Sequence, residues 1–233
     1  MAIARRIGGT VLVAAAVFAA SYGLSRLGAF EWPRRYDPLA LPDLTDRPGI
    51  FTNWQMKLVD ADAANCVFAL SRTGVPAQLK PSHGGGSCVV KGTIDMARLS
   101  VAKLTPEETR CAIAARLYMW ERHVLQPAAR RLFNEPVTEI LHFGSYSCRT
   151  IRGRGSMSQH ATANAFDISG FRLKSGRVVS VKADWGKPSN AGKFLFIARD
   201  SLCDWFNLTL SPDYNADHAD HFHVDMGWRR SCR

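Results

Sequence analysis

The chain has 233 residues, of which 46% are hydrophobic, so it is long enough for a sizeable core and too apolar for a disordered protein. Its formal net charge of +10 at pH 7 predicts attraction to an anionic partner such as nucleic acid, anionic lipid or an acidic cell-wall polymer. The sequence has no Lys/Arg run of the nucleic-acid-binding type, so we expect no nucleic-acid partner.

The N-terminal stretch has the composition of a membrane segment. Arg5 and Arg6 precede an almost uninterrupted apolar stretch at 7–24, about 18 residues, which reaches the lower limit for a helix that spans a bilayer. The basic residues predict a cytoplasmic N-terminus and an exported remainder. Because small residues such as Ala19 and Gly23 would also suit a signal peptidase, a cleaved signal peptide is the competing reading of residues 1–30.

Residues 31–50 contain four prolines among charged residues and predict an extended linker away from the membrane. A folded domain is expected at 51–233, beginning with a short helix near Asn53. Thr105-Pro-Glu-Glu108 has the chemistry of a capping box and predicts a helix that Pro127 kinks or ends. The apolar stripe expected on this helix is Ile113, Leu117, Trp120 and Val124, and the side chains expected to point away from it are Arg116, Glu121 and Arg122.

The sequence of the second half of the domain predicts several strands and one helix. Residues 137–142 alternate as in a strand, 167–173 and 177–181 predict a hairpin, and 220–225 predict a last strand. Pro188-Ser-Asn190 is a start signal for a helix of about 16 residues, in which Phe194, Ile197, Ser201 and Trp205 share a face. The expected fold class is α+β, with a small antiparallel sheet flanked by helices.

Six cysteines form an even set without a Cys-x-x-Cys pair, which predicts three disulfides and an oxidising compartment. Fifteen pairings are possible, and sequence alone proves none of them. Short loop closure favours Cys66 with Cys88, Cys111 with Cys148, and Cys203 with Cys232.

Two stretches carry chemistry suited to a metal. Residues 158–167 offer one histidine and one aspartate, and residues 218–223 offer three histidines. Imidazole and carboxylate suit a divalent first-row metal, and catalytic zinc takes three protein ligands and leaves a position open. On an extended strand His221 and His223 would project from the same face. These two stretches therefore predict a metal site.

The first stretch resembles the LAS-type zinc peptidases, whose pattern is Ser-x-His-x-x-Gly-x-Ala-x-Asp followed downstream by His-x-His. Ser158, His160, Ala165 and Asp167 match it as they stand, and Ala163 replaces the usual Gly. The resemblance implies an LAS/hedgehog-like fold whose sheet carries a zinc ion, with His160, Asp167 and His223 as the zinc ligands.

The same resemblance implies the other roles at the site. His221 corresponds to a histidine that contacts the developing oxyanion. His218 lies where the penicillin-insensitive murein endopeptidases carry a histidine as base, while Asp220 lies where other branches carry a base Glu, so the base is assigned to His218 with Asp220 in reserve. Arg149 is expected to polarise the scissile carbonyl or to bind a carboxylate. Ser158 and Tyr146 are further expected substrate contacts.

A narrower resemblance covers roughly residues 45–230. The stretches at 144–149, 125–129 and 210–215 are similar to the bacterial extensin-like C-terminal family. The N-terminal segment and the even cysteine set predict a periplasmic domain anchored to the inner membrane by residues 7–24. With the basic composition, the resemblances imply a zinc peptidase there, a D,D-endopeptidase or carboxypeptidase acting on peptidoglycan. The alternative is a non-catalytic zinc-containing envelope protein that binds wall polymer.

Overall fold

The computed structural model describes residues 2–233, apart from the side chains at 2–11 and 14. The helices are α1 (Ala2–Arg26), α2 (Thr52–Ala61), α3 (Ala63–Ser71), α4 (Cys111–Trp120), α5 (Gln126–Phe133), α6 (Val181–Asp184) and α7 (Asn190–Trp205). The strands are β1 (Thr93–Arg98), β2 (Lys103–Arg110), β3 (Val137–Gly144), β4 (Ala165–Leu173), β5 (Val178–Ser180), β6 (Leu208–Leu210), β7 (Phe222–Asp225) and β8 (Ser231–Cys232).

The eight strands form one sheet in the order β1-β2-β3-β4-β7-β6-β8, with β5 added beside β4. The predicted α+β class is confirmed, but the expectation of a small antiparallel sheet is wrong. The sheet has eight strands and is mixed, because β2 pairs with β3 and β6 pairs with β8 in parallel. The predicted hairpin is present as β4 and β5, which pair antiparallel.

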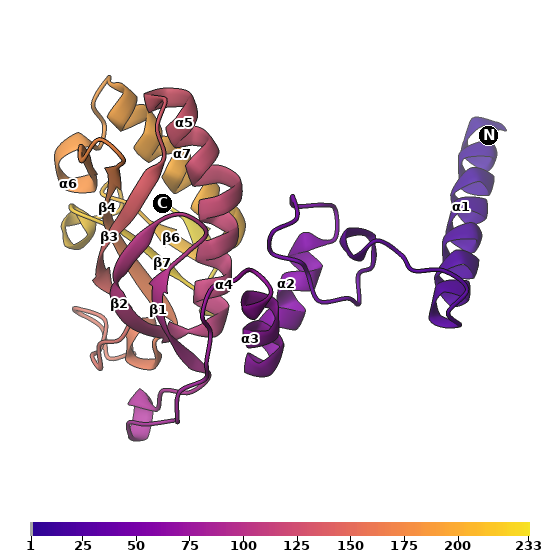
Figure 1. Ribbon diagram of the computed structural model, residues 1–233, viewed down its shortest axis with the longest axis horizontal. Helices are drawn as coiled ribbons and strands as arrows, with labels where there is room; N and C mark the ends of the chain where they lie inside the picture. Colours follow the sequence, from indigo (N-terminus) through magenta and orange to yellow (C-terminus); the bar gives the residue numbers. More distant parts are fainter. Residues whose placement is uncertain (1) are drawn as a thin grey trace.

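The main core lies between the sheet and the helices α4, α5 and α7 (Figure 1). Phe171 of β4 packs against Trp120 of α4 and against Phe194 of α7, with ring centroids 6.1 Å and 5.3 Å apart. Helix α7 begins where the sequence predicts, because the Ser189 hydroxyl caps it by accepting a hydrogen bond from the Gly192 amide.

The predicted capping box at 105–108 is wrong, because these residues lie in β2 and the helix begins only at Cys111. Pro106 is accommodated at a register shift between β1 and β2, the kind of position to which a proline within a sheet is confined. Pro127 does not end the helix. A π-helical turn at Glu121–Leu125 precedes it, and the helix continues through α5 to Phe133.

Two polar residues expected on the outer face of this helix are buried instead. Glu121 is 0% exposed, and its carboxylate accepts hydrogen bonds from the backbone amides of Ser100, Val101 and Ala102 at 3.0–3.2 Å. Arg116 is also buried and pairs with Asp60. The predicted apolar stripe is confirmed, and the helix is wrapped on a second side by the β1–β2 turn.

The disulfides are Cys66–Cys111, Cys88–Cys148 and Cys203–Cys232. The oxidised state of all six cysteines and the third pairing agree with the prediction, whereas the first two pairings are wrong. The β1–β2 hairpin lies between Cys88 and Cys111 and returns the chain to α3, so Cys111 at the start of α4 meets Cys66.

The N-terminal part reaches the domain through the Pro-rich segment. Helix α1 stands apart from the sheet and its helices (Figure 1). Leu44 is fully buried in the core, and its carbonyl oxygen accepts a hydrogen bond from His123 at 3.0 Å, so the end of the segment packs on the domain. In the described part of the chain, no helix combines the length and the apolar character needed to cross a bilayer, and the side chains at 7–11 and 14 of the predicted anchor lie outside that part.

Candidate metal centre and groove

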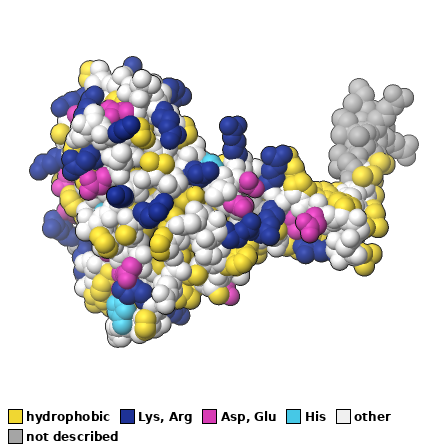
Figure 2. Space-filling view, viewed as in Figure 1, with side chains coloured by type: hydrophobic (Ala, Val, Ile, Leu, Met, Phe, Trp, Pro, Cys, Tyr) yellow, Lys and Arg dark blue, Asp and Glu magenta, His cyan; other side chains and the backbone are white. Residues whose placement is uncertain are grey.

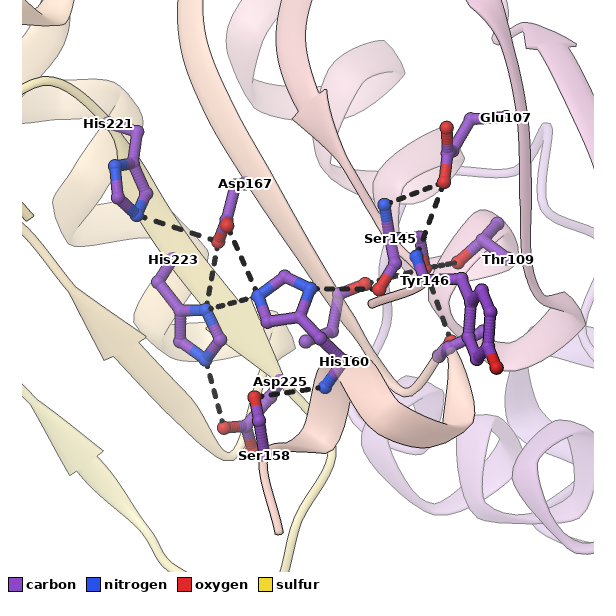
Figure 3. A network of polar contacts seen from close by, with 12 residues as sticks. Glu107, Thr109, Ser145, Tyr146, Ser158, His160, Asp167, His221, His223 and Asp225 are labelled. Carbon is purple, nitrogen blue, oxygen red and sulfur yellow. Dashed lines mark hydrogen bonds and ion pairs between the residues drawn. The ribbon is translucent and has the colours of Figure 1, made fainter. Parts of the chain in front are cut away.

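Two neighbouring strands and the turn before them build a cluster of three side chains (Figure 3). Asp167 of β4 is the register partner of His223 of β7, so the two side chains emerge side by side on one face of the sheet. His160 belongs to the 3-10 turn Gln159–Thr162 that leads into β4. Ala163 ends this turn with a φ of +52°, in the left-handed region that favours the glycine of the LAS-type pattern.

The three side chains are buried and their donor atoms converge. His160 Nε2 lies 3.1 Å from His223 Nδ1 and 3.1 Å from an Asp167 carboxylate oxygen, and His223 Nδ1 lies 2.9 Å from the other oxygen. One donor atom from each residue lies within 4.8 Å of the others. Ligand atoms of a tetrahedral zinc ion are about 3.3 Å apart, so this donor set fits such an ion. These are the three ligands predicted from the sequence.

Partners of the cluster fix the orientation of both imidazoles (Figure 3). His160 Nδ1 donates to the carbonyl oxygen of Ser145 at 2.8 Å, which leaves Nε2 directed at the cluster. His223 Nε2 donates to Asp225 at 3.1 Å, which leaves Nδ1 directed at it. Metal-binding histidines usually donate their second nitrogen to a carboxylate or a backbone carbonyl in this way.

The contacts that Asp225 and the Ser145 carbonyl oxygen make with the two imidazoles were not predicted from the sequence. Asp225 follows His223 by two residues on a strand and therefore faces the same side, a signal that was present in the sequence. The Ser145 carbonyl left no such signal, because any residue supplies a backbone oxygen. The Ser145 hydroxyl is itself fixed, since it donates to the Ala165 carbonyl oxygen at 2.7 Å.

The charges of the cluster are coupled in the metal-free protein. Burial alone raises the pKa of Asp167, but hydrogen bonds from His160 and His223 hold it well below its usual range. Burial lowers the pKa of His223, but hydrogen bonds to Asp167 and Asp225 outweigh it and raise the pKa to about 9. A proton on His223 thus balances the buried carboxylates where a cation would otherwise do so.

The cluster lies at a groove of about 860 Å³. Its lining includes His160, His223, Asp225 and His218, together with the predicted substrate contacts Arg149 and Ser158. Three further arginines line the same groove, namely Arg152, Arg154 and Arg229. Beyond the groove, Lys and Arg side chains are spread over the visible face of the molecule (Figure 2). The groove therefore suits an anionic ligand.

The remaining predicted site residues are divided between the groove and its surroundings. His218 Nδ1 is bound to Asn215 Oδ1 at 2.6 Å, and its ring centroid lies 5.8 Å from that of His223. Burial, followed by repulsion from His223 and His221, lowers the pKa of His218 to about 4, so it is neutral at pH 7.

Asp220 accepts a hydrogen bond from His221 Nδ1 at 2.9 Å, and His221 Nε2 lies 3.7 Å from Asp167. Asp220 thus orients His221 and is not among the residues that line the groove. Tyr146 is exposed, packs edge-on against His83 with ring centroids 5.9 Å apart, and likewise lies outside the groove lining.

Comparisons with known proteins identify the family but add no relative of known activity. Residues 64–233 match the family described as extensin-like protein C-terminus. No curated protein and no solved structure matches the chain. Since the match covers well over half of the sequence and includes every residue of the cluster and its groove, the chain belongs to the extensin-like protein C-terminus family.

Proposed function

We propose that this protein is a zinc-dependent peptidoglycan peptidase, a D,D-endopeptidase or carboxypeptidase that hydrolyses amide bonds of cell-wall stem peptides. The observation that carries the proposal is the buried cluster of His160, Asp167 and His223 beside an arginine-lined groove. The pattern shared with the LAS-type zinc peptidases at 158–167 supports the same reaction.

The three clustered side chains would hold zinc. When bound, zinc supplies Lewis acidity toward an amide carbonyl and acidifies water near pH 7. The protein contributes a rigid, pre-oriented donor set, because Ser145 and Asp225 fix the two imidazoles.

His218 is the proposed general base. It lines the groove, its Nδ1 is engaged by Asn215, and its low pKa keeps Nε2 free of a proton at neutral pH. His221, held by Asp220, is proposed to stabilise developing negative charge. Arg149 at the groove is proposed to bind a substrate carboxylate. Ser158 and Tyr146 are the further proposed substrate contacts, Tyr146 from outside the groove lining.

Peptidoglycan is the proposed substrate because its stem peptides combine amide bonds with carboxylates. The net charge of +10 and the groove arginines favour such a polymer. The three disulfides favour an oxidising compartment, so we place the domain in the periplasm and propose that residues 7–24 anchor it to the inner membrane.

A second candidate is a non-catalytic envelope protein that keeps the metal and uses the groove to bind wall polymer. It is favoured by one observation, that Asp220 is engaged with His221 and does not line the groove, so proton transfer depends on His218 alone.

Digestion of purified muropeptides by zinc-loaded protein, with mass spectrometry of the products, separates these functions. We expect cleavage of stem-peptide amides by the parent protein, none by His223→Ala, and a zinc content near one per chain only in the parent. Stoichiometric zinc without cleavage would favour the binding protein, and absence of zinc would contradict both.

A further inference from the structure

The C-terminal rim of the groove presents an exposed tryptophan. Trp228 is 84% exposed, more than any other large hydrophobic side chain in the family domain at 64–233, and it lines the groove. Trp is enriched among residues that dominate binding, because its large rigid surface is ordered at little entropic cost. The exposed indole beside the candidate metal centre is therefore a candidate binding surface for a ligand.

The backbone that carries Trp228 is fixed on both sides. The Gly227 amide donates to Asp225 at 2.7 Å, and the Asn207 side chain donates to the Gly227 carbonyl oxygen at 2.7 Å. Shortly after Trp228, Cys232 is held by its disulfide and by the pairing of β8 with β6. The indole is therefore displayed by an ordered segment, so that binding to it requires little further ordering.

The surroundings of Trp228 define what it can bind. The Arg229 guanidinium lies over the indole ring, 5.2 Å from its centroid. Of the four arginines that line the groove, only Arg152 forms an ion pair with a described residue, Asp217. The guanidinium groups of Arg149, Arg154 and Arg229 have no acidic partner among the described residues. A purely apolar partner would remove these guanidinium groups from water without compensation. The ligand must therefore combine an apolar face with polar edges and negative charge.

We propose that Trp228 and Arg229 form a saccharide subsite, in which a pyranose ring of the glycan strand stacks on the indole and acidic groups of the attached peptide meet the groove arginines. The identity of the polymer rests on the function proposed above. A pyranose ring has an apolar C–H face and a polar hydroxyl rim, which matches an amphipathic indole in a polar groove.

The distance along the chain from Trp228 to the cluster is compatible with this arrangement. Trp228 follows Asp225 by three residues, so their Cα atoms are at most about 11 Å apart. Asp225 in turn holds His223 of the cluster. A stem peptide of a few residues is long enough to cover such a span. The protein would thus recognise the sugar and place an amide a few residues away at the cluster, and it would prefer an intact muropeptide over the free peptide.

Ligand binding tests the subsite without requiring catalysis. The probes are a disaccharide tetrapeptide and the same tetrapeptide without sugar, titrated into zinc-free full-length protein and followed by tryptophan fluorescence and calorimetry. We expect the disaccharide to tighten binding at least tenfold in the parent, and Trp228→Ala to abolish that advantage while leaving the affinity for the free peptide unchanged.

Trp54→Ala is the matched control, because Trp54 is also exposed, at 52%, and also has a cation over its ring, Lys57 at 5.1 Å, but lies outside the groove. It should behave as the parent protein. Equal affinity of the parent for both probes would overturn the subsite. So would binding to anionic phospholipid vesicles that is lost in Trp228→Ala while muropeptide binding is retained.

The outcomes also separate this inference from the proposed function. Hydrolysis is assayed separately, with zinc-loaded protein and a cross-linked muropeptide that contains the D,D-amide bond absent from the tetrapeptide probes. Saccharide-dependent binding by the zinc-free protein, together with no hydrolysis of the cross-linked muropeptide by the zinc-loaded protein, would end the peptidase proposal and leave the subsite standing. Hydrolysis with equal kcat/KM for the cross-linked muropeptide and for the same cross-linked peptide without sugar, unchanged in Trp228→Ala, would remove the subsite and leave the peptidase.

Discussion

Asp225 lies outside the set of candidate zinc ligands but fixes the orientation of one of them, His223. Its Oδ2 accepts a hydrogen bond from His223 Nε2 and its Oδ1 accepts one from the Gly227 amide, so one carboxylate orients both a candidate ligand and the segment that carries Trp228. We expect Asp225→Asn to weaken zinc affinity about 10–100-fold while the stoichiometry remains one. Competition with a chromophoric chelator measures the affinity.

The control for this variant is Asp217→Asn. Asp217 also lines the groove but pairs with Arg152 and contacts no candidate ligand. Its zinc affinity should equal that of the parent. An equal loss in both variants would show that negative charge in the groove, and not orientation of His223, determines the affinity.

His218 is the residue to which proton transfer is assigned in the proposed function. Its replacement by alanine should lower the turnover of muropeptides by about two to four orders of magnitude, the usual contribution of general acid/base catalysis. Zinc content should not change, because His218 is not in the ligand cluster. His142→Ala, which removes a histidine of β3 outside the groove lining, serves as the control. Full turnover by His218→Ala would remove it from the mechanism.

The candidate ligands could be predicted from the sequence, but their supporting groups could not all be. Residue type and spacing single out the stretches at 158–167 and 218–223, and the resemblance to the LAS-type zinc peptidases selects His160, Asp167 and His223 within them. The structure brings these three together. Asp225 was recognisable by alternation on the strand. The carbonyl of Ser145 was not, because the contact depends on how the loop after β3 folds back on His160.

At the scale of elements, Glu121 connects the long helix to the β1–β2 turn. Its buried carboxylate accepts hydrogen bonds from three successive backbone amides, Ser100 to Ala102. Glu121→Ala would leave these donors without partners, so we expect the free energy of unfolding to fall by about 3 kcal/mol or more. Urea denaturation measures the change.

A surface acid provides the comparison for Glu121. Glu139 of β3 pairs with Arg172 of β4, and these two side chains are partly exposed to solvent, so Glu139→Ala should change the free energy of unfolding by about 1 kcal/mol or less. A similar small change in Glu121→Ala would mean that water satisfies the three amides and that the carboxylate is not a structural connector.

Local sequence patterns such as helix caps predicted some elements correctly and gave the wrong element at other positions. Helix α7 was predictable because its cap at Ser189 and its apolar period are both local. Thr105 to Glu108 carry an equally good capping signal, yet pairing with β1 places them in a strand. The predictions of the first two disulfide pairings were wrong for the same reason. Partners such as Cys66 and Cys111 meet only through tertiary contacts, which their distance in the sequence does not reveal.

For the whole molecule, the pKa of His223 predicts how stability depends on pH. In metal-free protein this pKa is raised from 6.5 to about 9, so its stabilising contribution is complete below pH 6.5 and is lost as pH rises through 9. The loss is on the order of 3 kcal/mol, or about 6–12 °C in Tm. Differential scanning calorimetry from pH 6.5 to 9.5 checks it.

Zinc-loaded protein and metal-free His223→Gln provide the two controls for this alkaline loss. Neither has a titrating imidazole at this position, so neither should show it. An equal decline in all three samples would place its origin elsewhere in the molecule.

The division of the cluster between β4 and β7 also has a consequence for the time at which the protein becomes competent. His223 follows Asp167 by 56 residues, so a chain that emerges N-terminus first has only two of the three donors until β7 has emerged. Any hydrolysis that needs all three is then withheld during synthesis and export. If the proposed function holds, fragments that end before β7 would therefore leave the cell wall uncut, and the order of synthesis alone would delay activity.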